Sequence, residues 1–448
     1  MTKILSNKSN IDLDYPICRP SLDLDFTQEV LDPRITYSRG SIGTRVNRNR
    51  LIETVSANTP RFDYDPVTGE CKGLLIEESR QNIILNSTTL SSHTNSDTVD
   101  TVTTETVSPD GTLNSYKVVG NSGARTRQSI YSNSFTMNAN SSYTASVFLK
   151  GTATRRYVVM WFDNTHPGNA PTEGPYYGAS VFIDLLTGTS TNSSIVKMIP
   201  YGNGWYRCHL TATVGASNLT NIFFNVSIGS PNGFSDTGNA SIYKYVGDAI
   251  SGIYYWGPQV EIGAFPTSYI PTSASTVTRS ADLADMRGSN FSSWYNSSEG
   301  TLYAAINNIT TRSSLSYDAF VSLAGTDVNR NVMRIYTQTA SGGGAQNQFF
   351  GAVSYSPDGS YAFNSFDTTV TGSPQRIGRA ILSYKKDNFA FTVNGLKPVT
   401  DISGDIPVCN RLLIFGASRF QSAPSGTISR LTYYPKALKP NQLQYLTQ

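Results

Sequence analysis

The sequence predicts an all-β protein of two or three domains. Three observations predict it. Charged residues make up only 15% of the 448 residues, aromatic residues make up 11%, and most of the chain divides into short runs of alternating, β-branched or aromatic residues. The chain is long enough for each domain to have its own core. Residues 84–275 show no 3.6-residue apolar period, which argues against helices there.

Residues 1–83 are predicted to be an extended N-terminal arm with a junction at its end. Residues 1–59 have little continuous apolar pattern, although Asp and Leu alternate in a strand-like way between positions 12 and 26. A long segment without its own core needs a partner to lie against, so we expect the arm to contact other subunits. Five arginines fall between positions 34 and 50, with no aromatic interleaving and no recognition helix. We interpret them as loop side chains that bind nearby Asp residues and carbonyls, not nucleic acid.

The junction is the stretch from Pro60 to Ser87. It begins extended, turns at Asp65-Pro66 and Thr68-Gly69, and continues as the apolar run 74–76. Asp-Pro and Gly favour turns, which predicts a hairpin-like entry into the body of the protein.

Residues 84–275 are predicted to form a jelly-roll β-sandwich. Strand-like runs recur here at short spacing, as in SYTASVFLK (142–150), YVVMWF (157–162) and GWYRCHLTATV (204–214). Both faces of 157–162 are apolar, which places that strand in the middle of a sheet. Pro266 and Pro271 end this body, and residues 276–448 form a second β-sandwich. Pro440 opens one short C-terminal helix.

Several segments resemble a family of tailed-bacteriophage virion proteins. LDPRITYSRGS (31–41) and PRFDYDPVTGECKGLLIEESRQN (60–82) resemble its N-terminal signature. NGWYRC (203–208) and YYWGPQVEIGAFPTSYIPT (254–272) resemble the later strands of its carbohydrate-binding jelly-roll module. GTLYAAI (300–306), DNFAFTVNG (387–395) and GTISRLTYYPKALKPNQLQYLT (426–447) are similar to its concanavalin-like or laminin-G-like lectin sandwiches.

The resemblance implies a structural protein on the surface of a virion, made in the cytoplasm of a bacterial host. It implies attachment to other virion proteins through the N-terminal arm, a homotrimer, and weak multivalent binding of host-surface glycans. The resemblance does not distinguish a head-decoration protein from a tail-fibre or baseplate protein. A purely structural clamp without sugar binding and a polysaccharide depolymerase are the two alternatives.

The predicted glycan-binding residues are Trp161, Asp163, Asn164, Tyr176 and Tyr177. They lie at the ends of a long polar loop, where aromatic rings could stack on sugars and the polar side chains could bind hydroxyls. Core packing of Trp161 is the competing interpretation.

No enzymatic activity is predicted. The acidic residues of 276–448 are isolated among turn residues, whereas glycosidases need two carboxylates at a defined separation. Glu77 and Glu78 are adjacent, so on a strand they would point to opposite faces. With Arg80, they are predicted to form a structural ion cluster that fastens the arm to the first sandwich.

The sequence predicts no cofactor, no nucleic-acid partner and no membrane insertion. The net charge is only +3, and no apolar run approaches the length of a membrane span. Calcium at Asp236, Asn239 and Asp248, or at Asp282 and Asp285, stays an open alternative, because these side chains offer the oxygen ligands that calcium takes. Neither spacing is that of an EF-hand loop, so the sequence does not predict a calcium site.

Overall fold

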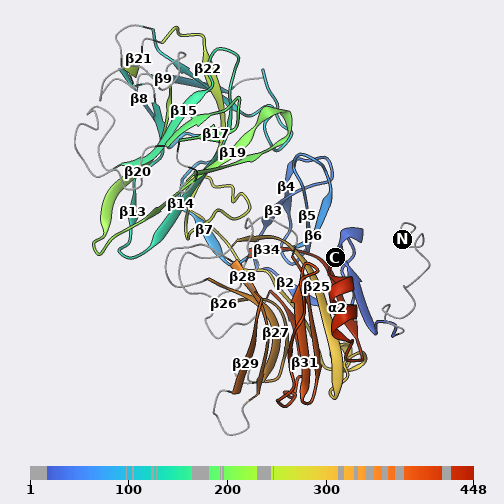
Figure 1. The fold of residues 1–448 in the computed structure, drawn as a ribbon. Coiled ribbons are helices and arrows are strands. Elements are labelled where there is room, and N and C mark those ends of the chain that lie inside the picture. Colours follow the sequence, from blue (N-terminus) through green and yellow to red (C-terminus); the bar gives the residue numbers. More distant parts are fainter. Residues whose placement is uncertain are drawn as a thin grey trace.

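The structure is a computed structural model of the chain. It describes residues 18–96, 98–102, 105–122, 126–127, 129–163, 181–191, 193, 196–229, 244–245, 247–310, 317–326, 331–339, 347–355, 362–368, 378–415 and 425–448. Nearly every element in these ranges is a β-strand, and the strands form two bodies that meet near β7 (Arg80–Asn82) (Figure 1). The all-β prediction is confirmed.

The first body, which we call the inserted sandwich, contains strands β8 to β22. Within the described residues it has a six-stranded and a seven-stranded sheet. The first sheet contains β9 (Thr98–Val102), β10 (Tyr116–Gly120), β14 (Ser142–Lys150), β18 (Val196–Pro200), β19 (Tyr206–Thr213) and β22 (Gly252–Ile262). The second contains β8 (Thr94–Ser96), β12 (Ser129–Tyr131), β13 (Phe135–Met137), β15 (Tyr157–Asp163), β16 (Val181–Asp184), β17 (Thr189–Ser190) and β20 (Leu219–Ile228).

Alternation along the long strands explains the core of the inserted sandwich. In β14, Tyr143, Ala145, Val147 and Leu149 point to one face and are fully buried in the apolar core. β14 lies between β19 and β22, so strands distant in the sequence are neighbours, as in a jelly roll. A short ribbon of β11 (Thr126–Arg127) and β21 (Lys244–Tyr245) is also present.

The second body, which we call the terminal sandwich, combines strands from both ends of the chain. Within the described residues its eight-stranded sheet contains β1 (Leu22–Asp25), β5 (Arg61–Tyr64), β6 (Cys71–Ile76), β25 (Glu299–Thr310), β30 (Gly378–Lys385), β31 (Asn388–Val393), β32 (Val399–Asp401) and β34 (Ser425–Tyr434). Its seven-stranded sheet contains β2 (Thr36–Ser38), β24 (Leu283–Arg287), β26 (Tyr317–Ala324), β27 (Val332–Thr339), β28 (Asn347–Tyr355), β29 (Ala362–Thr368) and β33 (Arg411–Ile414).

This arrangement corrects the predicted division of the chain at residue 83. Residues 22–76 are not a separate arm, because β1 and β6 pair with β34 and β2 pairs with β24. Their apolar side chains enter the core of the terminal sandwich, as Leu22, Phe62 and Ile76 do. Burying these side chains requires the C-terminal strands, which is the physical reason that the N-terminal segment shows no core of its own. The sheets of the inserted sandwich lie within the predicted range 84–275.

The chain leaves the terminal sandwich and returns to it at one place. β7 carries it out and β23 (Val277–Arg279) brings it back, and the two strands pair antiparallel with Asn82 opposite Val277. A hairpin of β3 (Gly43–Val46) and β4 (Ile52–Val55) lies beside this crossing (Figure 1).

Two local predictions are confirmed. The junction forms the β5–β6 hairpin, whose turn is closed by Asp65 accepting hydrogen bonds from the backbone N–H groups of Val67 and Thr68. The C-terminal helix is α2 (Pro440–Leu446), with proline at its first position and Leu443 buried. A single turn of helix, α1 (Ser289–Ser292), was not predicted, and short 3-10 turns occur at Phe26–Gln28 and Gly202–Gly204. No helix among the described residues is long and apolar enough to span a membrane.

Candidate functional site

The structure places two of the predicted glycan-binding residues on β15. Trp161 is 1% exposed and Asp163 is buried, on the face of β15 opposite to Met160 and Phe162, which pack in the core of the inserted sandwich. The buried Trp161 ring therefore does not offer a face to a sugar. Asn164, Tyr176 and Tyr177 lie outside the described residues. Trp205, Trp256 and Trp294 are also buried.

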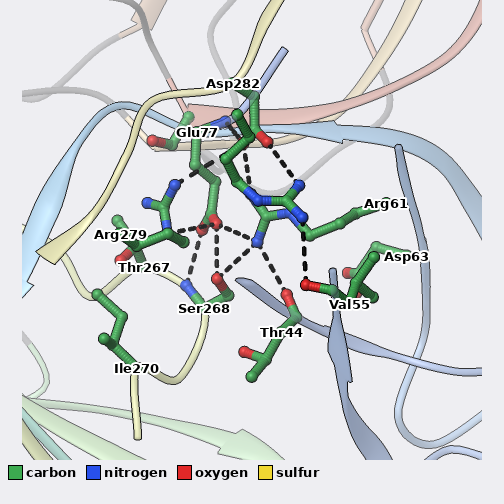
Figure 2. A network of polar contacts seen from close by, with 12 residues as sticks. Thr44, Val55, Arg61, Asp63, Glu77, Thr267, Ser268, Ile270, Arg279 and Asp282 are labelled. Atoms are coloured by element: carbon green, nitrogen blue, oxygen red, sulfur yellow. Dashed lines mark hydrogen bonds and ion pairs between the residues drawn. The ribbon is translucent and has the colours of Figure 1, made fainter. Parts of the chain in front are cut away.

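One of the predicted junction residues, Glu77, lies at the crossing between the two sandwiches, in a buried ion network (Figure 2). Glu77 accepts from Arg61 at 2.8 Å and lies 3.5 Å from the Arg279 guanidinium. Asp282 accepts from Arg39 at 3.1 Å, is ion-paired with Arg61, and lies 3.7 Å from Arg279. All five side chains are less than 6% exposed.

Glu78 and Arg80 form a second pair beside this network. Arg80 donates through Nε to Glu78, and its guanidinium lies 4.8 Å from the centre of the Phe265 ring. Glu77 and Glu78 thus face different surroundings. The predicted cluster is present as ion pairs, but Glu77 pairs with Arg61 and Arg279 and not with Arg80.

The five members of the network come from four parts of the chain, since Arg279 and Asp282 are only three positions apart. Arg39 follows β2, Arg61 opens β5, Glu77 follows β6, Arg279 ends β23 and Asp282 precedes β24. The loop after β22 adds Ser268, whose N–H and hydroxyl both donate to Glu77. The network therefore ties the N-terminal strands, the outgoing strand and the returning strand together at one point.

Sequence reasoning missed most of these partners. Arg39 belongs to the run of arginines that was interpreted as binding Asp residues and carbonyls, and it does bind Asp282 and the carbonyls of Val55 and Ser56. Arg279 and Asp282 form an i, i+3 pair, but the other ion pairs of Arg61, Arg279 and Asp282 gave no local signal, because those partners are up to 243 positions away in the sequence.

The surroundings of Glu77 favour its ionised form. Burial alone would raise the pKa of Glu77, but the Arg279 and Arg61 guanidinium groups and the Ser268 hydrogen bonds outweigh it and lower the pKa to about 2. Burial lowers the pKa of Arg279, opposed by Glu77, Asp282 and Glu261. Burial and the Asp282 charge raise the pKa of Tyr37. Glu261 is fully buried and accepts hydrogen bonds from the N–H and the hydroxyl of Thr267. With Glu77 and Asp282 it makes three carboxylates, the same number as the arginines of the network.

We expect Glu77 to make folding sensitive to acid. Its ordinary pKa is 4.5 and its folded-state pKa is about 2, so the unfolded chain binds the proton more readily. The ionised group stabilises the fold fully above pH 4.5, and that contribution of roughly 3 kcal/mol is lost as the pH falls towards 2. Urea unfolding of the native chain and of Glu77→Gln between pH 7 and 2 measures it. The variant should be less stable at pH 7 and should lose less stability in acid, and equal pH slopes would contradict the assignment.

The network is suited to holding the two bodies and not to reacting with a ligand, because its carboxylates are buried and paired with arginines. The described aspartates among the predicted calcium ligands are also paired with arginines. Asp282 lies in the network, Asp285 pairs with Arg287, and Asp248 pairs with Arg155. Asp236 and Asn239 lie outside the described residues. No cluster of potential metal ligands occurs among the residues that the structure describes.

A surface pocket of about 720 Å³ lies at the end of β24 and β33 in the terminal sandwich. Phe291, Tyr295 and Cys409 are its most buried lining residues. The more exposed lining residues carry hydrogen-bonding groups: Arg287, Ser292, Ser297, Thr326, Asn410 and Arg411. Sequence reasoning did not single out this pocket, because its walls come from the α1 turn and from loops more than 100 residues apart in the chain.

Comparison with known proteins gives structural likenesses only. No protein-family model matches the sequence, and no curated relative matches it either. A carbohydrate-binding module of family 40 from the Ruminococcus gnavus IT-sialidase is 15% identical, covering 36% of this chain and 88% of the module, with a TM-score of 0.27. The same module bound to α2,6-sialyllactose is 16% identical over the same shares, with a TM-score of 0.28. Domains LG4-5 of the mouse laminin α1 chain are 10% identical, covering 71% of this chain and 92% of theirs, with a TM-score of 0.22. The fold of this chain is established by its own strand pairing.

Proposed function

We propose that this chain is a structural protein of a bacteriophage particle that displays two β-sandwiches and binds glycans weakly and in several copies. The observation that carries the glycan half is the pocket at the end of β24 and β33. The virion half is supported by the segments that resemble phage proteins, above all residues 60–82.

The pocket has the composition of a sugar site. Tyr295, which is half-buried, gives it an aromatic ring, and rings of this kind pack against the C–H groups of pyranose rings. Phe291 is 2% exposed and packs against Tyr295, with the two ring centres 4.6 Å apart. Ser292, Ser297 and Asn410 supply hydroxyl and amide groups for sugar hydroxyls. An open site with few polar groups gives low affinity per copy. A homotrimer on a particle that carries many copies would multiply that affinity by orders of magnitude.

A glycan array probed with the full chain, multimerised through a biotin tag, tests the proposal. We expect binding that is lost in Ser292→Trp, which fills the pocket, and kept in Ser293→Trp. Ser293 is the neighbouring exposed residue and does not line the pocket. Failure of the multimerised chain to retain any glycan would overturn the glycan half.

The second candidate is a clamp that joins neighbouring virion subunits without binding sugar. The burial of Trp161 favours it, because the aromatic ring most expected at a sugar site in the inserted sandwich is part of the core. Imaging of particles labelled on this protein, compared with particles that lack it, separates the candidates. A clamp is needed for particle stability, whereas an adhesin is needed for attachment to host cells.

We propose binding without catalysis. The most concentrated group of carboxylates, Glu77, Glu261 and Asp282, is buried and bound to arginines or hydroxyls, so it offers no general acid or base to a polysaccharide. Release of reducing ends from host polysaccharide by the purified chain would contradict this assignment.

A further inference from the structure

Two arginines face each other where β24 ends and β33 begins. Arg287 is directly opposite Arg411 in the antiparallel register of the two strands, and both side chains line the pocket. Directly opposite residues of an antiparallel pair have Cβ atoms about 5 Å apart on the same face of the sheet. Like charges at such positions repel each other and destabilise the pair, so their presence requires compensation.

The described contacts compensate only part of this charge. Arg287 donates through Nε and Nη2 to one oxygen of Asp285, at 2.8 and 2.5 Å. Arg411 donates to the backbone carbonyls of Gly325 and Thr326 at 2.8 to 3.1 Å and makes no ion pair within the part of the chain that the structure describes. Neutral carbonyl groups orient a guanidinium but do not cancel its charge.

None of the lining residues that the structure describes is Asp or Glu. The two described lining groups that could lose a proton, Tyr295 and Cys409, have their pKa values raised by burial and stay neutral at physiological pH. Within the described residues, the pocket thus combines an aromatic ring, neutral hydrogen-bonding groups and a positive charge on Arg411 that has no carboxylate partner.

We propose that this pocket binds the carboxylate of an acidic saccharide, such as a uronic acid residue of a surface polysaccharide. This inference rests on the proposed glycan binding and adds the ligand class. The planar guanidinium of Arg411, oriented by Gly325 and Thr326, pairs with the carboxylate, and Arg287 adds a second positive charge. Tyr295 receives the ring of the sugar.

The test uses the full chain and two matched ligands, an oligogalacturonate and its carboxyl-reduced, neutral counterpart. We expect the acidic form to bind at least ten-fold more tightly, with an advantage that shrinks as salt is added. Arg411→Gln should remove most of the preference for the acidic form, so that the ratio of the two affinities falls towards one. Arg48→Gln is the control for the loss of one positive charge, since Arg48 is exposed and lies in the β3–β4 hairpin, outside the lining of the pocket.

Asp285→Asn gives a readout of opposite sign. It releases Arg287 from its partner, so binding of the acidic form should increase several-fold, which loss of folding could not produce. Equal binding of the acidic and reduced ligands would overturn this inference and leave glycan binding intact. An acidic peptide bound as tightly as the oligogalacturonate would overturn the saccharide class. Failure of every variant to bind either ligand or any arrayed glycan would overturn the proposed function as well.

Discussion

Replacement of Asp282 by alanine is expected to lower the free energy of unfolding by about 3–5 kcal/mol. Asp282 is 1% exposed and pairs with Arg39 and Arg61, which have no access to water. Its loss leaves the Arg39 guanidinium buried without its carboxylate partner and leaves Arg61 paired with Glu77 alone. It also removes the acceptor for the Tyr37 hydroxyl and the Glu77 N–H. Removing one member of a buried ion pair costs far more than the intact pair contributes, because the remaining charge cannot be solvated.

Chemical denaturation of the variant and of Asp405→Ala measures the effect. Asp405 forms an ion pair with Lys386 in which both side chains are more than half exposed, so its removal should cost less than about 1 kcal/mol. A similar small loss for both variants would show that water reaches the crossing between the sandwiches. Unfolding of the Asp282→Ala variant in two separated steps would show that the network couples the two bodies.

Residues 276–448 expressed alone are expected not to fold. They would lack β1, β2, β5 and β6 and seven core side chains of the N-terminal segment: Leu22, Leu24, Phe26, Ile35, Phe62, Leu74 and Ile76. Each buried apolar side chain contributes about 1.5–3 kcal/mol, so their combined loss is of the same size as the whole stability of a domain. β34 would also lose its pairing with β1 and β6.

A polypeptide in which Asn-Gly joins residues 18–82 directly to 277–448 is expected to fold. Asn82 and Val277 are paired across β7 and β23, so a two-residue hairpin turn can span them. Its stability should be below that of the full chain, because Glu77 loses the hydrogen bonds from Ser268. Circular dichroism and cooperative thermal unfolding of the two polypeptides measure the difference. Cooperative folding of 276–448 alone would mean that the N-terminal strands are dispensable.

The sequence predicted the elements better than their partners. Alternation of apolar residues marks β14, and Pro440 marks the start of α2, because these signals are local. The alternation Leu22, Asp23, Leu24 shows that one face of β1 is buried. Nothing nearby in the sequence says that β1 pairs with β34. The predicted arm was wrong for this reason.

The candidate sites show the same limit. Burial of Glu77 could be anticipated from the apolar residues before it, whereas Arg61 and Arg279 reach it only through the fold. Trp161 was selected for its position beside a polar loop, but its ring is buried. The opposed Arg287 and Arg411 lie 124 positions apart, so their juxtaposition follows from strand register alone.

The pairing of β1 with β34 also sets an order of events during synthesis. Asp23 and Thr432 are 409 positions apart, so at about 5–20 residues per second the N-terminal strands wait roughly 20 to 80 s for their partners to be translated. The inserted sandwich, whose strands all lie between residues 94 and 262, is complete on the ribosome well before then. Throughout that interval the apolar side chains of Leu22, Leu24 and Phe26 lack the strands that bury them in the folded chain. We therefore expect a cotranslational chaperone to bind this segment of the nascent chain.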